Sequence, residues 1–244
     1  MKSVNIYYLY NSGFYLETEG NIFIFDYFYD KPYGHARALN TGVIPEEVIK
    51  SNKKIYVFVS HNHSDHFNPL IFDWANMNPK IRYILSSDVK VNGIFNKYYT
   101  LNINETRRFD DLYVKAYGST DEGISFLINV NGITIFHAGD LNWWHWKEDS
   151  DDDNLRAEEW FKREILNLKS ERIDIAFFPV DPRQEEYYYI GGEYFINNIK
   201  PKFFIPMHFG NTSGITHKFS IHMQNCGTKI IEIDKRGCNI KIEF

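Results

Sequence analysis

Long apolar runs and cysteines are both scarce in this sequence. No stretch approaches the roughly 18 consecutive apolar residues that indicate a membrane-spanning helix, so no membrane span and no membrane partner are predicted. The opening residues MKSVNIYYLYNSGFYL have no clear apolar core with a small-residue cleavage site, so no signal peptide is predicted. Cys226 and Cys238 lack metal-ligand spacing, which favours free thiols over a disulfide. We therefore expect a cytoplasmic protein.

Positive charge is also in short supply. The 27 lysines and arginines are outnumbered by 32 aspartates and glutamates, which gives a formal net charge of −5. A protein that binds nucleic acid usually gathers basic residues on one face to neutralise phosphates, and no basic stripe is visible here. The sequence therefore argues against nucleic acid as the main partner. It also lacks a phosphate-cradling glycine loop and a serine nucleophile elbow, and it does not specify an oligomeric state.

The composition is that of a globular protein rich in aromatic rings. Apolar residues make up 43% and charged residues 24% of the 244 residues, which is an ordinary balance. The 20 Phe, 17 Tyr and 5 Trp predict a core with much ring packing. A chain of this length can bury a full core and no linker interrupts it, so residues 1–244 are predicted to form a single domain.

Short aromatic and β-branched runs alternate with amphipathic segments along the chain. Asn131-Gly132, between two alternating apolar runs, is a strong hairpin signal. Strands are predicted at 4–10, 13–18, 21–28, 54–60, 81–85, across most of 107–140, and at 173–180, 202–207, 228–234 and 238–244. Helices are predicted at 44–51, 68–79, 154–169, 191–201 and 216–225. This order predicts an α/β (α+β) protein with two sheets between helical layers.

The helix predicted at 154–169 follows an acidic run. Its apolar residues recur at helical spacing and should form one buried face. That face is expected to consist of Leu155, Phe161, Ile165 and Leu168. The run EDSDDD at 148–153 lacks the spacing of a calcium loop. We expect a solvated loop there, whose negative charge favours the N-terminus of the helix.

Three histidines and an aspartate crowd the segment SHNHSDHF at 60–67. Three of the nine histidines of the chain lie within six consecutive positions, at the end of the buried strand predicted at 54–60. Neutral imidazole and carboxylate are ligands that a zinc-class ion takes, and ligands on one tight turn converge at little cost in entropy. The order H-x-H-x-D-H therefore predicts a metal site.

This motif, at 61–66, resembles that of the metallo-β-lactamase-fold hydrolases. The likeness extends to FHAGD, whose Asp140 matches the metal-bridging aspartate of the family, and to PMHFGN, whose His208 matches its late metal-ligand histidine. The opening NSGFYLETEGNIFIFD, which ends at Asp26, also follows the family pattern. The resemblance is closest to the compact branch that includes bacterial lactonases acting on sugar phosphates. It implies an αββα four-layer sandwich of two pseudo-symmetric halves, with metals at one sheet edge.

The resemblance implies two metal sites, and one of them is incomplete in this sequence. The second site has a full set of ligands, namely Asp65, His66, Asp140 and His208. The first site would use His61, His63 and a third histidine within 114–123. That segment contains no histidine, and Ser119 or a neighbour occupies its place.

Three interpretations of the missing histidine stay open. The protein binds one ion at the second site only; or His145, favoured over His137, supplies the missing ligand; or the protein is a weakened, non-catalytic metal-binding or regulatory member of the fold. His137 lies three residues before Asp140 in a strand, so its side chain should point to the opposite face. We expect His137 to be a hydrogen-bonded structural residue, and one or two ions to bind per chain.

The chemistry that the resemblance implies is hydrolysis of a small molecule. A bound zinc ion lowers the pKa of its water to about 7 and so supplies hydroxide at neutral pH. We expect that hydroxide to cleave a small ester, lactone or phosphodiester. Asp65 is the predicted catalytic residue, because its carboxylate can orient the attacking water or accept its proton. Zinc is the expected ion, with manganese or iron as alternatives, and a nuclease of the same fold is a further alternative function.

Substrate contacts are predicted at three places. Asp181 and Arg183 lie in PVDPRQEEYYYIGG after a strand, and the planar Arg183 guanidinium suits a carboxylate or phosphate. A simple Asp-Pro turn explains the same residues equally well. Ser119 is a third candidate contact. The run WWHW at 143–146 closely follows the FHAGD segment, so it predicts either an aromatic wall beside the metals or core packing.

Overall fold

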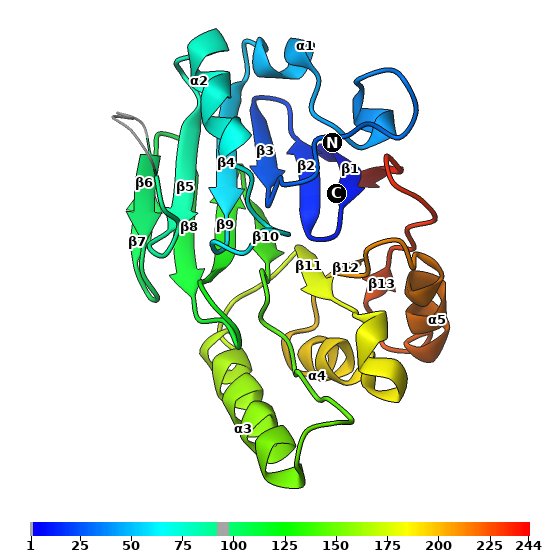
Figure 1. Ribbon diagram of the computed structural model, residues 1–244. Coiled ribbons are helices and arrows are strands. Elements are labelled where there is room, and N and C mark those ends of the chain that lie inside the picture. The colour runs from blue at the N-terminus through cyan, green and yellow to red at the C-terminus, as the bar shows by residue number, and fades with distance from the viewer. Residues whose placement is uncertain (1, 92–97) are drawn as a thin grey trace. The chain divides into compact units, whose positions relative to one another are not determined.

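A computed structural model describes residues 2–91 and 98–244, and the chain divides into two compact units. Unit 1 comprises Met1–Thr100 and Asp234–Phe244, and unit 2 comprises Leu101–Ile233. Each unit contains one mixed β-sheet with helices (Figure 1), which confirms the predicted α/β class. The single domain 1–244 stays a prediction. Among the described residues, no helix has both the length and the apolar character needed to cross a membrane.

The sheet of unit 1 joins an antiparallel meander to parallel strands. Within the described residues the strand order is β14-β1-β2-β3-β4-β5-β6. The strands are β1 (Ser3–Tyr10), β2 (Gly13–Glu17), β3 (Asn21–Phe25), β4 (Lys54–Val59), β5 (Arg82–Ser86), β6 (Tyr98–Leu101) and β14 (Asn239–Glu243). The short helices are η1 (Leu39–Thr41), α1 (Glu46–Ile49), η2 (Pro69–Asp73) and α2 (Trp74–Met77). β3, β4 and β5 run parallel, so the residues after β3 and after β4 lie at one edge of the sheet.

Unit 2 repeats this plan with longer helices. The strand order in the described residues is β13-β12-β11-β10-β9-β8-β7, antiparallel from β7 to β10 and parallel from β10 to β13. The strands are β7 (Thr106–Arg108), β8 (Leu112–Tyr117), β9 (Ser125–Val130), β10 (Ile133–His137), β11 (Ile175–Pro179), β12 (Phe203–Met207) and β13 (Lys229–Ile230). The helices are α3 (Asp151–Asn167), η3 (Pro182–Tyr187), α4 (Ile190–Ile199) and α5 (Gly214–His222). The residues that follow β10, β11 and β12 therefore share an edge, the position where open α/β sheets hold their ligands.

Two local predictions are confirmed at a turn and in the core of unit 2. Asn131 and Gly132 both have positive φ, 52° and 71°, as a two-residue hairpin turn between β9 and β10 requires. Aromatic rings fill much of the core. The Phe178 and Phe195 rings lie 4.5 Å apart, with Phe195 on α4 facing β11. Such a ring pair contributes about 0.5–1.5 kcal/mol beyond its buried area.

Helix α3 differs from the predicted helix in its start and in its buried face. It begins at Asp151, so residues 151–153, predicted as loop, form its first turn. The Ser150 hydroxyl accepts a hydrogen bond from the Asp153 N–H (3.2 Å), and this cap together with the favourable charge at the helix N-terminus explains the earlier start. Leu155 is 52% exposed, while Phe161, Ile165 and Leu168 are buried as predicted. Leu155 lies about 120° around the axis from Phe161 at 3.6 residues per turn, so the predicted face was too wide.

The strand predicted at 228–234 is also shorter than expected. Only Lys229–Ile230 pair with β12 as β13. Beyond them the Ile233 N–H donates to the Thr216 hydroxyl of α5 (3.0 Å), so the chain turns toward the helix and leaves the ladder. The prediction failed because this side-chain contact competes with strand pairing.

Arg236 ties the C-terminal part of unit 1 to its N-terminal loops. Its guanidinium donates to four backbone carbonyls: Leu9 (2.5 Å), Lys31 (2.6 Å), Gly42 (2.7 Å) and Tyr29 (3.0 Å). The cation also lies over the Tyr29 ring, 4.5 Å from its centroid. Hydrogen bonds from a charged donor are stronger than neutral ones, so this one side chain fixes the path of several loop segments.

We expect Arg236→Ala to lower the free energy of unfolding by about 2–4 kcal/mol, because it leaves four carbonyls without their donor, two of them, Leu9 and Gly42, partly buried. Urea unfolding followed by circular dichroism measures the change. Arg163→Ala is the control, since Arg163 on α3 is largely exposed and makes only a loose contact with Glu164 at 3.8 Å. Equal stability of the two variants would contradict the role given to Arg236.

Candidate metal centre

The motif residues converge at the end of β4 in unit 1. His61 and His66 are fully buried, and His63 and Asp65 are half-buried. The His61 ring lies 4.5 Å from that of His63 and 4.1 Å from that of His66, measured between centroids. Ligand atoms of His61 and His63 lie within 4.8 Å of each other, and so do those of Asp65 and His66. A tight turn, closed by the His66 N–H donating to the His63 carbonyl (3.1 Å), brings the four residues together.

A buried aspartate at the end of the neighbouring strand orients two of these histidines. Asp26 accepts hydrogen bonds from the Ser60 N–H (2.8 Å) and the Ser60 hydroxyl (2.7 Å), and its Oδ2 lies 2.8 Å from His66 Nδ1. The Ser60 hydroxyl in turn lies 3.0 Å from His61 Nδ1. Because its proton goes to Asp26, the hydroxyl accepts from His61. Both rings thus carry their proton on Nδ1 and present the Nε2 lone pair, the arrangement typical of metal-bound histidine.

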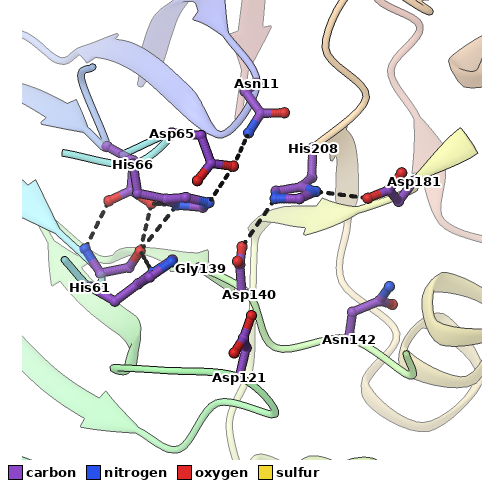
Figure 2. Close-up of polar contacts among 12 residues, drawn as sticks. Asn11, His61, Asp65, His66, Asp121, Gly139, Asp140, Asn142, Asp181 and His208 are labelled. Carbon is purple, nitrogen blue, oxygen red and sulfur yellow. Dashed lines mark hydrogen bonds and ion pairs between the residues drawn. The ribbon is translucent and has the colours of Figure 1, made fainter. Parts of the chain in front are cut away.

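Asn11 is a residue of this site that the sequence analysis missed. Its amide donates to Asp65 Oδ2 (3.2 Å), and the same oxygen lies 3.7 Å from His66 Nε2 (Figure 2). Its own N–H donates to the Tyr8 hydroxyl (2.9 Å), and its φ of 51° lies in the left-handed region that asparagine tolerates. The Asn-Ser-Gly turn was visible in the sequence, but nothing in it pointed to Asp65, 54 residues further on.

Unit 2 brings Asp140 and His208 together at the edge formed by β10 and β12. The His208 Nε2 and the Asp140 Oδ1 lie 3.4 Å apart, and Figure 2 marks this contact with a dashed line. Both side chains are nearly buried. His208 has a φ of 64°, and Gly139 beside Asp140 has a φ of 55°. Non-glycine residues with positive φ are uncommon and gather at functional sites, where the surrounding structure holds them.

Asp181 lies behind His208. Its Oδ2 is 3.0 Å from His208 Nδ1, and its carboxylate accepts hydrogen bonds from the Arg183 N–H (2.8 Å) and guanidinium (2.9 Å to Nε). Burial alone would raise the pKa of the Asp181 carboxyl, but the hydrogen bonds from His208 and Arg183 outweigh it and lower that pKa. An ionised Asp181 keeps the proton of His208 on Nδ1 and directs Nε2 toward Asp140. Asp181, predicted as a substrate contact, thus contacts the candidate ligand His208.

A cavity of about 310 Å³ opens beside Asp140 and His208 in unit 2. It is lined by Thr120, Asp121, Asp140, Trp144, Trp146, Arg183 and His208. Trp144 and Trp146 stack with their centroids 5.7 Å apart and their planes at 5°. The Trp144 indole N–H donates to the Asp140 carbonyl (3.0 Å), which fixes the ring against the segment that carries the carboxylate. Two of the aromatic residues at 143–146 therefore form a wall of this cavity.

Neither residue proposed at the place of the missing histidine lines this cavity. The His145 ring packs on Tyr187, with 3.8 Å between centroids. Ser119 is buried, and its hydroxyl accepts the Asp121 N–H (3.3 Å). His137, expected to be structural, is buried and accepts the Gly139 N–H at Nδ1 (3.2 Å). Arg183, a predicted substrate contact, does line the cavity.

The donor groups present fit a metal ion of the zinc class. Three imidazoles are held through Nδ1 by serine or aspartate, so that Nε2 is the nitrogen that would coordinate a metal ion in each of them. Carboxylates stand next to two of these imidazoles, Asp65 beside His66 and Asp140 beside His208. Nitrogen and oxygen ligands of this kind suit zinc, iron and manganese.

Proteins of known structure resemble this chain in fold while sharing little of its sequence. No protein-family model matches the sequence. Igni18, a metallo hydrolase from the archaeon Ignicoccus hospitalis, shares 14% identity at a TM-score of 0.65, with 99% of each chain covered. YhfI from Bacillus subtilis, a metallo-β-lactamase fold protein, shares 10% identity at a TM-score of 0.64, over 99% of this chain and 100% of that one. The chain has the metallo-β-lactamase fold.

The metallo-β-lactamase fold hosts more than one metal chemistry. CmlA from Streptomyces venezuelae, a diiron β-hydroxylase, matches 100% of this chain with 54% of its own, at 12% identity and a TM-score of 0.60. The fold prediction is thus confirmed, while the fold alone specifies neither zinc nor a substrate.

Proposed function

We propose that the protein is a metal-dependent hydrolase that cleaves a small ester, lactone or phosphodiester. The observation that carries the proposal is that aspartates hold two of its histidines in a fixed orientation. His66 and His208 are each held at Nδ1 by a buried aspartate, Asp26 in one case and Asp181 in the other. Buried aspartates that fix the tautomer of a histidine are typical of the surroundings of metal ligands.

The ligands follow the family resemblance. By that resemblance His61 and His63 would be ligands of a first ion, and Asp65, His66, Asp140 and His208 would be ligands of a second. When bound, such an ion lowers the pKa of a coordinated water to about 7 and polarises a carbonyl or phosphoryl oxygen. Zinc is the expected ion, and the likeness to a diiron protein supports testing iron and manganese beside it.

Asp65 is the proposed proton acceptor. Its side chain is 46% exposed, so water reaches it, and the Asn11 amide bound to Oδ2 sets the orientation of its carboxylate. A general base must lie within hydrogen-bond reach of the proton that it takes. We expect Asp65 to orient the attacking water and to accept its proton.

The cavity wall supports a substrate with a flat apolar group. Trp144 and Trp146 offer an aromatic face, and the Arg183 guanidinium lies 5.8 Å from the centroid of the Trp146 ring. Arg183 is 62% exposed while its Nη2 binds Asp181. We propose that the aromatic pair packs against the apolar part of the substrate, and that Arg183 contacts a negatively charged group where the substrate carries one.

The test is turnover of metal-loaded protein on a panel of simple esters, lactones and phosphodiesters. Protein loaded with zinc, iron(II) or manganese(II) is compared with chelator-treated protein on each substrate. We expect turnover that depends on the metal for at least one class. Firm metal binding with no turnover of any substrate in the panel would contradict the hydrolase proposal and favour a non-catalytic member of the fold.

Trp146→Ala is expected to lower kcat/KM about 5-fold for an aryl ester and little for a methyl ester, because only the aryl group loses a ring contact worth about 1 kcal/mol. Metal content should stay unchanged. Leu166→Ala is the matched control, an apolar truncation on the exposed side of α3 in the same unit. An equal loss on both esters would point to a disturbed fold and count against a substrate contact.

A further inference from the structure

We infer that Asp121 supplies a carboxylate ligand for a metal ion beside Asp140 in unit 2, in place of the histidine that this segment lacks. The inference rests on the proposed function. Asp121 lies within 114–123, the segment in which the resemblance expects the third histidine. Asp121 is not a histidine, but a carboxylate can take the same coordination position.

Asp121 shares the cavity with the unit 2 ligands. It lines the same space of about 310 Å³ as Asp140 and His208. In Figure 2 its side chain points toward Asp140. No hydrogen bond or ion pair engages the Asp121 carboxylate within the residues that the structure describes, although its backbone N–H is bound to Ser119. A carboxylate that points toward another ligand candidate and makes no ion pair within the described residues is suited to bind a metal ion.

The loop that carries Asp121 is tied to the segment that carries Asp140. The buried Thr120 hydroxyl donates to the Asn142 carbonyl (2.6 Å) and accepts the Asn142 N–H (2.9 Å). Asn142 is held in turn by its side chain, which donates to Gln184 Oε1 (2.8 Å). These bonds fix the backbone next to both carboxylates, so Asp121 and Asp140 keep their relative position. Preorganisation of this kind is what a metal site needs from its scaffold.

The substitution changes which ion the site prefers. A ligand set in which Asp121 takes the place of a neutral histidine carries one more negative charge. Carboxylate oxygen is a harder donor than imidazole nitrogen and suits manganese and iron better. We therefore expect this site to bind zinc less selectively than a three-histidine site does.

The experiment measures metal stoichiometry and needs no activity. Metal-free protein is reloaded separately with zinc, iron(II) or manganese(II), desalted, and analysed by elemental mass spectrometry. Wild type, Asp121→Ala, Asp121→Asn and Asp121→His are compared. Glu122→Ala is the matched control, an acidic neighbour that does not line the cavity. Circular dichroism verifies that every variant is folded, and the near-isosteric Asp121→Asn guards against a loop disturbance in Asp121→Ala.

We expect two equivalents of metal per chain in wild type and in Glu122→Ala. Asp121→Ala and Asp121→Asn should each retain one equivalent of metal per chain. Asp121→His should regain the second equivalent and raise the preference for zinc over manganese at least about 10-fold, the scale of a change in ligand environment. Two equivalents retained in both Asp121→Ala and Asp121→Asn would overturn the inference. One equivalent in wild type that the Asp121 variants also keep would overturn it too, while leaving a one-metal hydrolase intact. No metal in wild type would instead defeat the proposed function.

Discussion

Replacing His208 by alanine is expected to remove one metal ion per chain and to lower kcat/KM about 1,000-fold or more. Loss of an outer partner alone typically costs 10–100-fold in metal affinity or activity, and His208 is itself a proposed ligand, with Nε2 3.4 Å from Asp140. His66→Ala should have the same effect, because His66 is its counterpart in unit 1. Elemental mass spectrometry on protein purified without chelator or immobilised-metal resin gives the metal content.

His217→Ala is the control for these two variants. Its side chain is 65% exposed and pairs with Glu232 on the surface of unit 2, so its loss should change neither metal content nor turnover. Full metal content in both His66→Ala and His208→Ala would refute the assignment of the second site. Loss of metal in only one of them would show that the two histidines do not serve one ion.

Asp26→Ala is expected to lower metal affinity about 10–100-fold and to lower the free energy of unfolding by about 3–5 kcal/mol, the usual result of breaking a buried pair. Asp26 is fully buried and accepts from the backbone and the hydroxyl of Ser60, and its Oδ2 lies 2.8 Å from His66 Nδ1. Without it the His66 ring loses the partner that fixes its tautomer.

The two effects of Asp26→Ala are separated by measuring them independently. Unfolding by urea is followed on metal-free protein, because a bound ion would add its own stabilisation. Metal affinity is measured by competition with a chromophoric chelator at a temperature where the variant is folded. Asp152→Ala, on the exposed first turn of α3, is the control. Lower stability with unchanged metal affinity would reduce Asp26 to a packing residue.

The fold and the centre of the site followed from short segments of the sequence. The apolar run before His61 predicted a buried strand, and an apolar strand also precedes Asp140 and His208. Parallel strands end at one edge, so side chains after β10 and β12 meet although 68 residues separate them in the chain. The hairpin at 131–132 was equally local, because a two-residue turn with positive φ selects Asn-Gly.

What the sequence could not give are contacts between distant side chains. Asp26 and His66 are 40 residues apart, and no local pattern indicates that their side chains meet. Asp121 was overlooked because the family pattern directs attention to histidine at that place. Leu155 of α3 was predicted to be buried and is exposed for another reason. Exposed apolar residues are common on protein surfaces, so helical periodicity alone overestimates the width of a buried face.

The pairing of β14 with β1 has a consequence for synthesis of the chain. Val4 lies opposite Ile242, and Arg236 donates a hydrogen bond to Leu9 across 227 residues. Unit 1 is therefore assembled from the first and the last segments of the chain to leave the ribosome. All of residues 101–233 are made in between. Until 234–244 emerge, the outer edge of β1 stays unpaired, and an open strand edge invites association with other chains. Nascent or truncated chains that stop at residue 233 should therefore need a chaperone, or aggregate, even though unit 2 is already complete.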